Sequence, residues 1–191
     1  LNYNLYLSIV VQKPDLSFYL KEKRLLIHGN FNVNRLTACI NNTGDGWWTW
    51  VNGYSSNQFY LFKIGDQDTV AGPFIQEIGN VLTVENLGIG HAAFSPDAKL
   101  MGINTNNHDL LLYDFDNATG EFSNFRSIHY PDTTTSSAEG MVFSMDSKLA
   151  YVTAGRDLYQ IDIQNETAMH IAHHTSADEE GWPVGMGFMY P

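Results

Sequence analysis

One phrase of this sequence occurs twice, and that repeat constrains the fold more than any other feature. Residues 91–100 (HAAFSPDAKL) return 49 residues later as residues 140–149 (GMVFSMDSKL). Each copy is followed by an aromatic-rich run that contains aspartate, LYDFD at 112–116 and LYQID at 158–162. A period of about 40 to 50 residues with strands inside it is the signature of β-propeller blades.

The repeated phrase predicts a strand end, a tight turn and the start of the next strand. Pro96 presets φ at the first central position of the turn, and Asp97 can hydrogen-bond the backbone beyond it. In the second copy Met145 replaces the proline, whereas Asp146 keeps the turn. Two such hairpins that share a central strand give a four-stranded antiparallel sheet. The sequence therefore predicts an all-β fold, a β-propeller of four-stranded antiparallel blades.

Diverged copies extend the repeat toward both ends of the chain. Residues 47–51 and 58–64 are predicted strands of a third copy, and residues 185–191 resemble the opening of another. Three upstream runs are predicted to be outer strands of an earlier blade: residues 5–11, 17–20 and 24–28. The chain is thus predicted to be a single, partial propeller domain. The predicted blades are residues 1–33 (partial), 34–84, 85–134, 135–180 and 181–191 (start only).

Composition limits the classes of partner. Hydrophobic residues make up 43% of the chain and charged residues only 16%, which suits a large core and excludes a disordered protein. The net charge of −11 and the scattered basic residues argue against nucleic acid, because a phosphate backbone needs a focused positive face. No apolar run approaches the roughly 18 residues of a membrane span, so no membrane insertion is predicted. The single cysteine, Cys39, allows no internal disulfide and is predicted to be a buried, inert thiol.

Several segments together resemble a known family. They are residues 35–48 (RLTACINNTGDGWW), 56–60 (SNQFY), 72–79 (GPFIQEIG) and 116–120 (DNATG). With the repeated phrase, this series resembles the N-terminal propeller of large Bacteroidetes cell-surface proteins, whose propellers are similar to the lactonase-like, WD-type class with seven blades. The resemblance implies that this chain is part of a seven-bladed propeller. The sequence departs from that pattern at Gly46, which follows Asp45, and at Met145.

The resemblance implies a location and a role. Such proteins are typically exported through the type IX secretion system, and many are gliding-motility-associated or carry adhesion modules. It therefore implies an extracellular, cell-surface protein that binds protein or glycan ligands. A partial propeller leaves sheet edges open, which soluble proteins avoid. The remaining blades are expected to come from residues outside this chain or from another copy.

A cluster of aromatic residues is the first candidate ligand site. Trp47, Trp48, Trp50 and Tyr54 suggest a carbohydrate-stacking platform, because sugar rings pack on exposed aromatic faces. Propellers also bury aromatic side chains between blades, and strand alternation sends Trp47 and Trp48 to opposite faces. Core packing is the interpretation we favour, with a ligand surface as the alternative.

A group of histidines is the second candidate. His170, His173 and His174 come shortly before Asp178, so imidazole and carboxylate ligands occur within one segment. His170 and His174 would share a face only in a helix, which no capping signal predicts. The spacing also matches no zinc motif. A solvated loop between blades is the favoured interpretation, and neither a metal nor a cofactor is predicted.

Two classes of function fit these observations. The first is a non-catalytic extracellular propeller that serves as a scaffold or recognition module, and the alternative is a lactonase-like propeller hydrolase with an active site on the channel face. The fold alone does not decide, because propellers host both. The first is favoured, since no converging carboxylates and histidines are evident at matching positions of successive blades. No catalytic residue is therefore predicted. Three or more His, Asp or Glu side chains within about 4–6 Å of each other at the starts of the inner strands would revive the enzyme.

Overall fold

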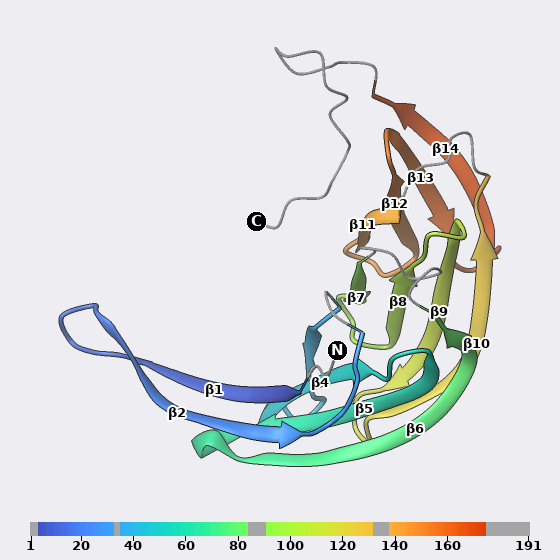
Figure 1. The fold of residues 1–191 in the computed structure, drawn as a ribbon. Helices are drawn as coiled ribbons and strands as arrows, with labels where there is room; N and C mark the ends of the chain where they lie inside the picture. Colours follow the sequence, from blue (N-terminus) through green and yellow to red (C-terminus); the bar gives the residue numbers. More distant parts are fainter. Residues whose placement is uncertain (1–3, 33–34, 84–90, 132–137, 175–191) are drawn as a thin grey trace.

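A computed structural model describes residues 4–32, 35–83, 91–131 and 138–174 (Figure 1). Within these ranges the chain contains β-strands and one short 3₁₀ turn, Asp66–Asp68, but no α-helix. Accordingly, the described residues include no helix with the length and apolarity needed to cross a membrane. The last predicted blade start, residues 181–191, lies outside the described residues.

The strands form three four-stranded antiparallel sheets and one two-stranded sheet. The two-stranded sheet contains β1 (Leu5–Gln12) and β2 (Phe18–Ile27). The first sheet contains β3 (Thr37–Ile40), β4 (Gly46–Asn52), β5 (Ser56–Gly65) and β6 (Val70–Leu82). The second sheet contains β7 (Ala92–Phe94), β8 (Leu100–Asn104), β9 (Asp109–Asp116) and β10 (Glu121–His129). The third sheet contains β11 (Ala138–Phe143), β12 (Leu149–Ala154), β13 (Asp157–Asp162) and β14 (Thr167–His173).

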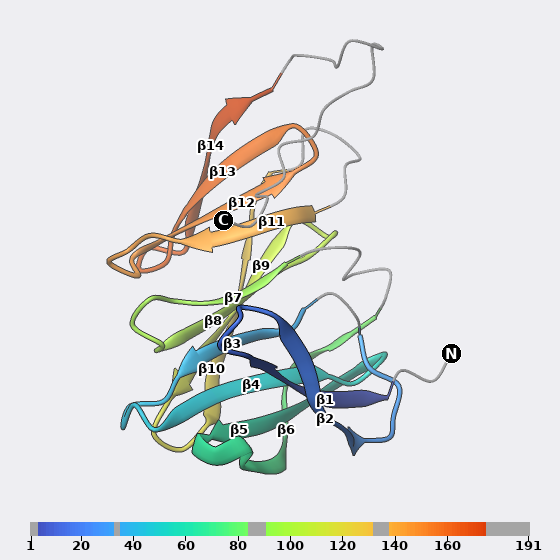
Figure 2. The ribbon, with the colours of Figure 1, turned by 90° about the vertical axis from the view of Figure 1, so that its left-hand side faces the viewer.

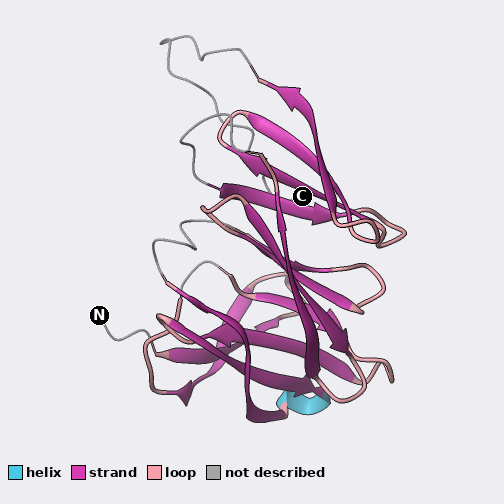
Figure 3. Cartoon of the chain, turned by 90° about the vertical axis from the view of Figure 1, so that its right-hand side faces the viewer, coloured by secondary structure: helices cyan, strands magenta, loops and turns pink. Residues whose placement is uncertain are grey.

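The sheets follow one another along an arc, as the blades of a propeller do. Figure 1 shows β7 and β11 toward the inner side of the arc, with β6, β10 and β14 along its outer rim. Figure 2 shows the sheets stacked in order from the first to the third, and Figure 3 shows that strands make up nearly all of the regular structure in the described residues. In each four-stranded sheet every strand pairs with the strands next to it in the sequence. The prediction of an all-β propeller built from four-stranded antiparallel blades is confirmed.

Large aromatic side chains fill the interfaces between successive sheets. Between the first and second sheets, the rings of Phe59 and Tyr113 lie 5.2 Å apart, and both side chains are fully buried. Between the second and third sheets, Tyr130 lies 5.0 Å from Tyr159, and both are again buried. Such pairs bury a large apolar area while their edges and faces attract one another. Buried aromatic side chains therefore help to join successive blades.

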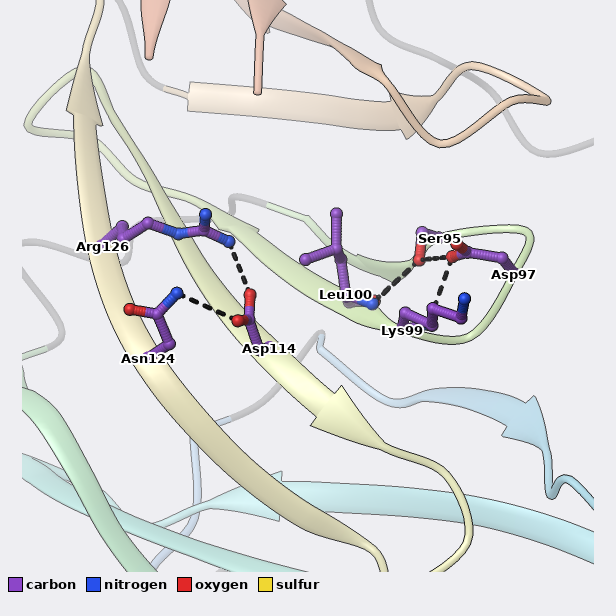
Figure 4. Close-up of polar contacts among 7 residues, drawn as sticks. All are labelled: Ser95, Asp97, Lys99, Leu100, Asp114, Asn124 and Arg126. Carbon is purple, nitrogen blue, oxygen red and sulfur yellow. Dashed lines mark hydrogen bonds and ion pairs between the residues drawn. The ribbon is translucent and has the colours of Figure 1, made fainter. Parts of the chain in front are cut away.

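The repeated phrase forms the turn between the first two strands of the second and third sheets. The Ser95 hydroxyl donates a hydrogen bond to Asp97 Oδ1 at 2.7 Å and accepts one from the Leu100 amide at 2.9 Å (Figure 4). The hydroxyl of Ser144 donates in the same way to Asp146 Oδ1 at 2.7 Å. The turn predicted from the sequence is present in both copies, with or without the proline.

The strand pairing matches the residues of the two repeats differently from the comparison of their sequences. Leu100 lies opposite Asp114 in the second sheet, and Leu149 lies opposite Asp162 in the third. Asp114, which accepts hydrogen bonds from β10 in Figure 4, therefore corresponds to Asp162. The match between the two aromatic runs made from the sequence is wrong by two residues. A shift of two preserves the inward and outward alternation of a strand, so the hydrophobic pattern alone does not reveal it.

One break predicted in the N-terminal region is absent. Residues 17–20 and 24–28 were expected to be separate strands, but both belong to β2, which pairs with β1. The intervening Lys21 stays at the surface, with its Nζ 2.5 Å from a carboxylate oxygen of Asp68. Charged residues therefore do not end this strand, because the hairpin that carries them is solvent-exposed.

Candidate functional site

The four residues of the aromatic candidate site do not form one surface. Trp48 and Trp50 are buried in the core, and the indole N–H of Trp48 donates to the backbone oxygen of Asn117 at 3.0 Å. Trp47 and Tyr54 are 51% and 49% exposed. Trp47 lies at the start of β4 and Tyr54 lies in the turn after its end, and seven residues of extended chain span about 20 Å. The two buried tryptophans pack in the core, and the two exposed rings lie too far apart to hold one sugar together.

The histidine segment is a strand, so the prediction of a loop between blades is wrong for its first part. β14 pairs with β13 along its length and includes His170 and His173. His174 follows the strand, and its backbone N–H donates to the backbone oxygen of Arg156 at 2.8 Å. Asp178 lies outside the described residues. The sheet thus brings two of the three histidines next to the start of β13.

Two imidazoles converge there on one buried carboxylate, and we call Asp157, His170 and His173 the Asp157 cluster. His170 Nε2 lies 2.7 Å and His173 Nδ1 lies 2.8 Å from the same oxygen, Asp157 Oδ1. The Asp157 side chain is 1% exposed, whereas the imidazoles are 40% and 42% exposed. Because an ionised carboxylate only accepts hydrogen bonds, both ring nitrogens donate to it. The second nitrogen of each neutral ring, Nδ1 of His170 and Nε2 of His173, then carries a lone pair.

A β-bulge in β14 makes this convergence possible. Asp157 pairs with His173, and Tyr159 pairs with His170. The two pairs are therefore two residues apart on β13 but three residues apart on β14. Residues two apart on a strand share a face. Both imidazoles therefore reach the face of Asp157 only because β14 contains one additional residue, Ile171, and bulges of this kind re-aim side chains. In an unbroken register His170 would lie opposite Gln160 and point to the other face.

The cluster rests on buried aromatic rings. The His170 ring lies 5.2 Å from the ring of Tyr159, which in turn packs on Tyr130 from the second sheet. Burying a carboxylate is costly unless it receives hydrogen bonds, and here two imidazole N–H groups provide them. Weak screening among buried rings strengthens these bonds. The cluster is therefore a fixed acid–base group with a buried carboxylate and two solvent-accessible imidazoles.

The geometry suits proton transfer better than metal binding. Among the described ranges, no three His, Cys, Asp or Glu side chains are arranged to bind a metal ion. In the Asp157 cluster the nitrogens that face the carboxylate act as hydrogen-bond donors, and they have no lone pair left for a metal there. The cluster also lies on the two outer strands of its sheet rather than at the start of an inner strand. The cluster therefore does not meet the criterion set from the sequence, which required such side chains at the starts of the inner strands.

The second sheet carries a simpler version of the same arrangement. Asp109 begins β9 as Asp157 begins β13, and it pairs with His129, the last residue of β10. The distance from His129 Nδ1 to Asp109 Oδ1 is 3.1 Å, and the Asp109 side chain is 28% exposed. Asp157 was not among the residues predicted from the sequence, since it lies 13 residues before His170 and on another strand. The signal available was this repetition, an aspartate opening the third strand and a histidine closing the fourth.

Two surface pockets lie elsewhere, beside the turn between β5 and β6. One, of about 390 Å³, is lined by Asp45 and Lys63, which form an ion pair at 3.4 Å. Hydrogen bonds from Asn41 and Thr43 hold the pKa of Asp45 at about 2. The other, of about 500 Å³, includes Asp68, which is already paired with a lysine of β2. Neither pocket is lined by a histidine, and their paired charges offer no proton acceptor comparable to the Asp157 cluster.

Two further residues of potentially reactive types, His91 and Cys39, make structural contacts. His91 Nδ1 lies 3.2 Å from the backbone oxygen of Met141 and so links the second sheet to the third. Cys39 is buried in the core, and this burial raises the pKa of its thiol to about 12. A thiol with so high a pKa is not a nucleophile at neutral pH.

Comparison with known proteins identifies the fold. No protein-family model and no curated protein matches the sequence. The chain is similar to a solved candidate 6-phosphogluconolactonase from Bacteroides uniformis, with a TM-score of 0.57 and 14% identity over 93% of this chain and 51% of that one. A candidate 6-phosphogluconolactonase from Bacteroides fragilis gives a TM-score of 0.55 and 13% identity over 88% and 51%. A protein from Lactobacillus plantarum gives 0.59 and 16% over 87% and 50%. The chain thus spans about half the length of these structures and has the fold of a lactonase-like β-propeller.

Proposed function

We propose that this chain is part of a propeller hydrolase that opens cyclic sugar esters, with the Asp157 cluster as its acid–base group. The observation that carries the proposal is the convergence of His170 and His173 on the buried Asp157 carboxylate, at 2.7 and 2.8 Å. Imidazole is the side chain that exchanges protons near neutral pH. A carboxylate that fixes the tautomer and orientation of an imidazole is a recurrent device for general-base catalysis. A hydrolase is therefore preferred here to a scaffold, as in the alternative considered from the sequence, but with its acid–base group on the two outer strands of a blade and not on the channel face.

The proposed reaction is addition of water to the lactone carbonyl. One imidazole of the cluster takes a proton from a water molecule through its free ring nitrogen. The water oxygen bonds to the carbonyl carbon, and the tetrahedral intermediate then breaks the bond between that carbon and the ring oxygen. The ring oxygen leaves as an alcohol after it receives a proton, so lactone and water give one hydroxy acid. No electron donor or acceptor is needed.

The buried carboxylate and the second imidazole support this step. Asp157 stabilises the imidazolium that forms when either ring accepts the proton, because it lies within hydrogen-bond distance of both. The imidazolium then donates this proton from the same nitrogen to the departing ring oxygen, while the other imidazole, which also donates to Asp157, keeps the carboxylate in position. General acid–base catalysis of this kind contributes about 10² to 10⁴ in rate.

The substrate class is suggested by the similar folds. Two of the similar structures are candidate 6-phosphogluconolactonases, which points to sugar lactones as the first compounds to test. At 13% to 14% identity the similarity identifies the fold and not the substrate. The Asp157 cluster supplies the independent reason to expect hydrolysis.

The test uses the complete polypeptide with 6-phosphoglucono-δ-lactone and glucono-δ-lactone, and a pH-stat records acid release above the spontaneous rate. We expect hydrolysis by the wild type and a loss of about 100-fold or more in kcat for the double variant H170Q/H173Q. The matched control is H129Q, which removes the imidazole paired with Asp109 and should change kcat by less than about twofold. Absence of hydrolysis by the wild type, or full activity of the double variant, would overturn the proposal.

A further inference from the structure

The two imidazoles of the Asp157 cluster reach the carboxylate in different ways. His173 lies directly opposite Asp157 in the ladder between β13 and β14, so the strand pairing itself brings these two side chains together. His170 lies opposite Tyr159 instead, two residues further along β13. Side chains in such a diagonal position start about 7–8 Å apart, compared with about 5 Å for a direct pair. The strands alone therefore place His173, whereas His170 needs a further support to lean toward Asp157.

The ring of Tyr159 provides that support. It lies opposite His170, with 5.2 Å between the ring centroids and 57° between the ring planes. Tyr159 is 1% exposed and so is fixed by its packing, whereas the His170 side chain is 40% exposed and has room for other rotamers. The rotamer that the Tyr159 ring supports is the one in which His170 Nε2 contacts Asp157 Oδ1.

A buried side chain of the second sheet fixes the Tyr159 ring in turn. Tyr130 packs on it at 5.0 Å and is fully buried. The Tyr130 hydroxyl donates to Asn104 Oδ1 at 2.6 Å, and its backbone N–H donates to the backbone oxygen of His108 at 2.8 Å. Tyr130 is therefore held both at its main chain and at the far end of its ring, which leaves the buried ring one position.

Asn104, the last residue of β8, connects this support to the third sheet. Its fully buried side-chain amide donates to the backbone oxygens of Gly140 in β11 at 3.2 Å and Thr153 in β12 at 3.1 Å. The residue after Thr153, Ala154, pairs with Asp157. One amide of the second sheet thus fixes both the end of β12 beside the carboxylate and the tyrosine behind the imidazole.

We propose that Tyr159 is a positioning residue of the Asp157 cluster, fixed across the blade interface by Tyr130 and Asn104. Its consequence for catalysis rests on the proposed function, because a proton acceptor acts only while it keeps the productive orientation. The second sheet then has a part in a site whose acid–base groups all belong to the third sheet. Of the two imidazoles, only that of His170 depends on the Tyr159 ring.

Imidazole N–H signals in ¹⁵N–¹H spectra of the complete polypeptide test this proposal without any substrate. At low temperature the wild type should show one slowly exchanging signal from His170 and one from His173, because both N–H groups donate to a buried carboxylate. Y159L removes the ring, and we expect it to lose the His170 signal and retain that of His173. Y159F keeps the ring and should retain both signals.

The matched control is Y113L, which removes an equally buried ring from the interface between the first and second sheets and should also retain both signals. Retention of both signals in Y159L would overturn the proposal. Loss of the His173 signal in Y159L, or of either signal in Y113L, would show general loosening of the fold and would overturn it as well.

A measurement on the unmodified protein decides the matter even if Y159L does not fold. Order parameters of the imidazole C–H bonds should show His170 to be as rigid as His173, and both to be more rigid than His129, whose side chain is 66% exposed. A His170 ring as mobile as that of His129 would contradict the proposal.

Kinetics separate this inference from the proposed function. With glucono-δ-lactone as substrate, Y159L should lower kcat about 10-fold and leave KM within about twofold, whereas Y159F should change both by less than about twofold. A full kcat in Y159L would overturn the positioning role and leave the proposed function intact. Absence of hydrolysis by the wild type would overturn the proposed function, and the NMR signals would then decide the positioning of His170 by themselves.

Discussion

The second and third sheets share one sequence pattern but differ in chemistry at the same corner. Each has an aspartate that opens its third strand and a histidine that closes its fourth. In the second sheet this pair, Asp109 and His129, is partly exposed and separated by 3.1 Å. In the third sheet the carboxylate of Asp157 is buried and serves two imidazoles.

One inserted residue accounts for much of this difference. The bulge in β14 turns His170 toward Asp157, whereas the equivalent stretch of β10 has no second histidine there. The buried carboxylate then has two donors in place of one. A repeated structural pair is thereby converted into an acid–base group, while the strand order and the turns of the blade stay the same.

The largest expected difference between the sheets concerns the contact between them. A Cβ built on Gly102 would lie 2.6 Å from Met141 Cε and 3.1 Å from Phe143 Cζ. Tyr151, at the same register position of the third sheet, is large and only half-buried. We expect G102V to lower the free energy of unfolding by about 2–3 kcal/mol through overpacking. Y151V should cost no more than about 1 kcal/mol, and equal losses in urea unfolding would contradict this account of the interface.

The next effect compares the serines of the two turns. The Ser95 hydroxyl is almost fully buried, whereas Ser144 is half-buried, although each makes the same hydrogen bonds. We expect S95A to cost about 1–2 kcal/mol because it leaves buried groups without a partner. S144A is expected to cost less than about 1 kcal/mol, since water can replace its hydroxyl. A larger loss for S144A than for S95A in chemical unfolding would contradict the prediction.

A smaller effect depends on pH. The pKa of Asp97 is lowered: desolvation raises it, but hydrogen bonds from Ser95, Ser147 and the Lys99 amide together outweigh that effect. A hydrogen bond from Ser144 is the main reason that the pKa of Asp146 is also lowered. The ionised forms therefore stabilise the fold above the ordinary aspartate pKa of 3.8, and this stability is lost as the pH falls below it.

Thermal unfolding between about pH 5 and pH 2.5 tests this prediction, because the two carboxylates take up protons within that range. The variant D97N/D146N should lose less stability on acidification than the wild type. An unchanged pH dependence would show that these turns do not contribute to acid sensitivity.

The smallest effect tests the proline of the turn. Pro96 occupies the position that Met145 occupies in the third sheet, where the methionine side chain is 88% exposed. We expect M145P to stabilise the protein by about 0.5 kcal/mol, because proline restricts the unfolded chain and no packing is lost. P96A should destabilise by a similar amount. Destabilisation by M145P would show that the two turns differ in backbone conformation.

The sequence was sufficient to predict the blades, because their signals are local. The turn phrase, the alternating strands and the absence of helical periodicity all lie within short windows. The continuity of β2 could not be predicted, since it depends on an exposed hairpin that tolerates Lys21 within a strand. The two-residue shift between the aromatic runs could not be predicted either, because it leaves the hydrophobic pattern unchanged.

The candidate site was only half predicted. His170 and His173 were named only among the metal-ligand candidates, together with His174 and Asp178. Their partner Asp157 belongs to another strand, and the bulge that brings them together is a property of the register between β13 and β14. Trp48 and Trp50 were expected in the core and are buried there. Export to the cell surface, type IX secretion and recognition of glycans or proteins stay predictions that rest on sequence resemblance.

The most direct measurement of the central claim is the tautomeric state of the histidines by long-range ¹⁵N–¹H NMR. At about pH 8 the account predicts that His170 carries its proton on Nε2 and His173 on Nδ1, each donating to the Asp157 carboxylate. D157N should abolish both preferences and leave His129 unchanged. A His173 protonated on Nε2, or histidine signals indifferent to D157N, would contradict the account.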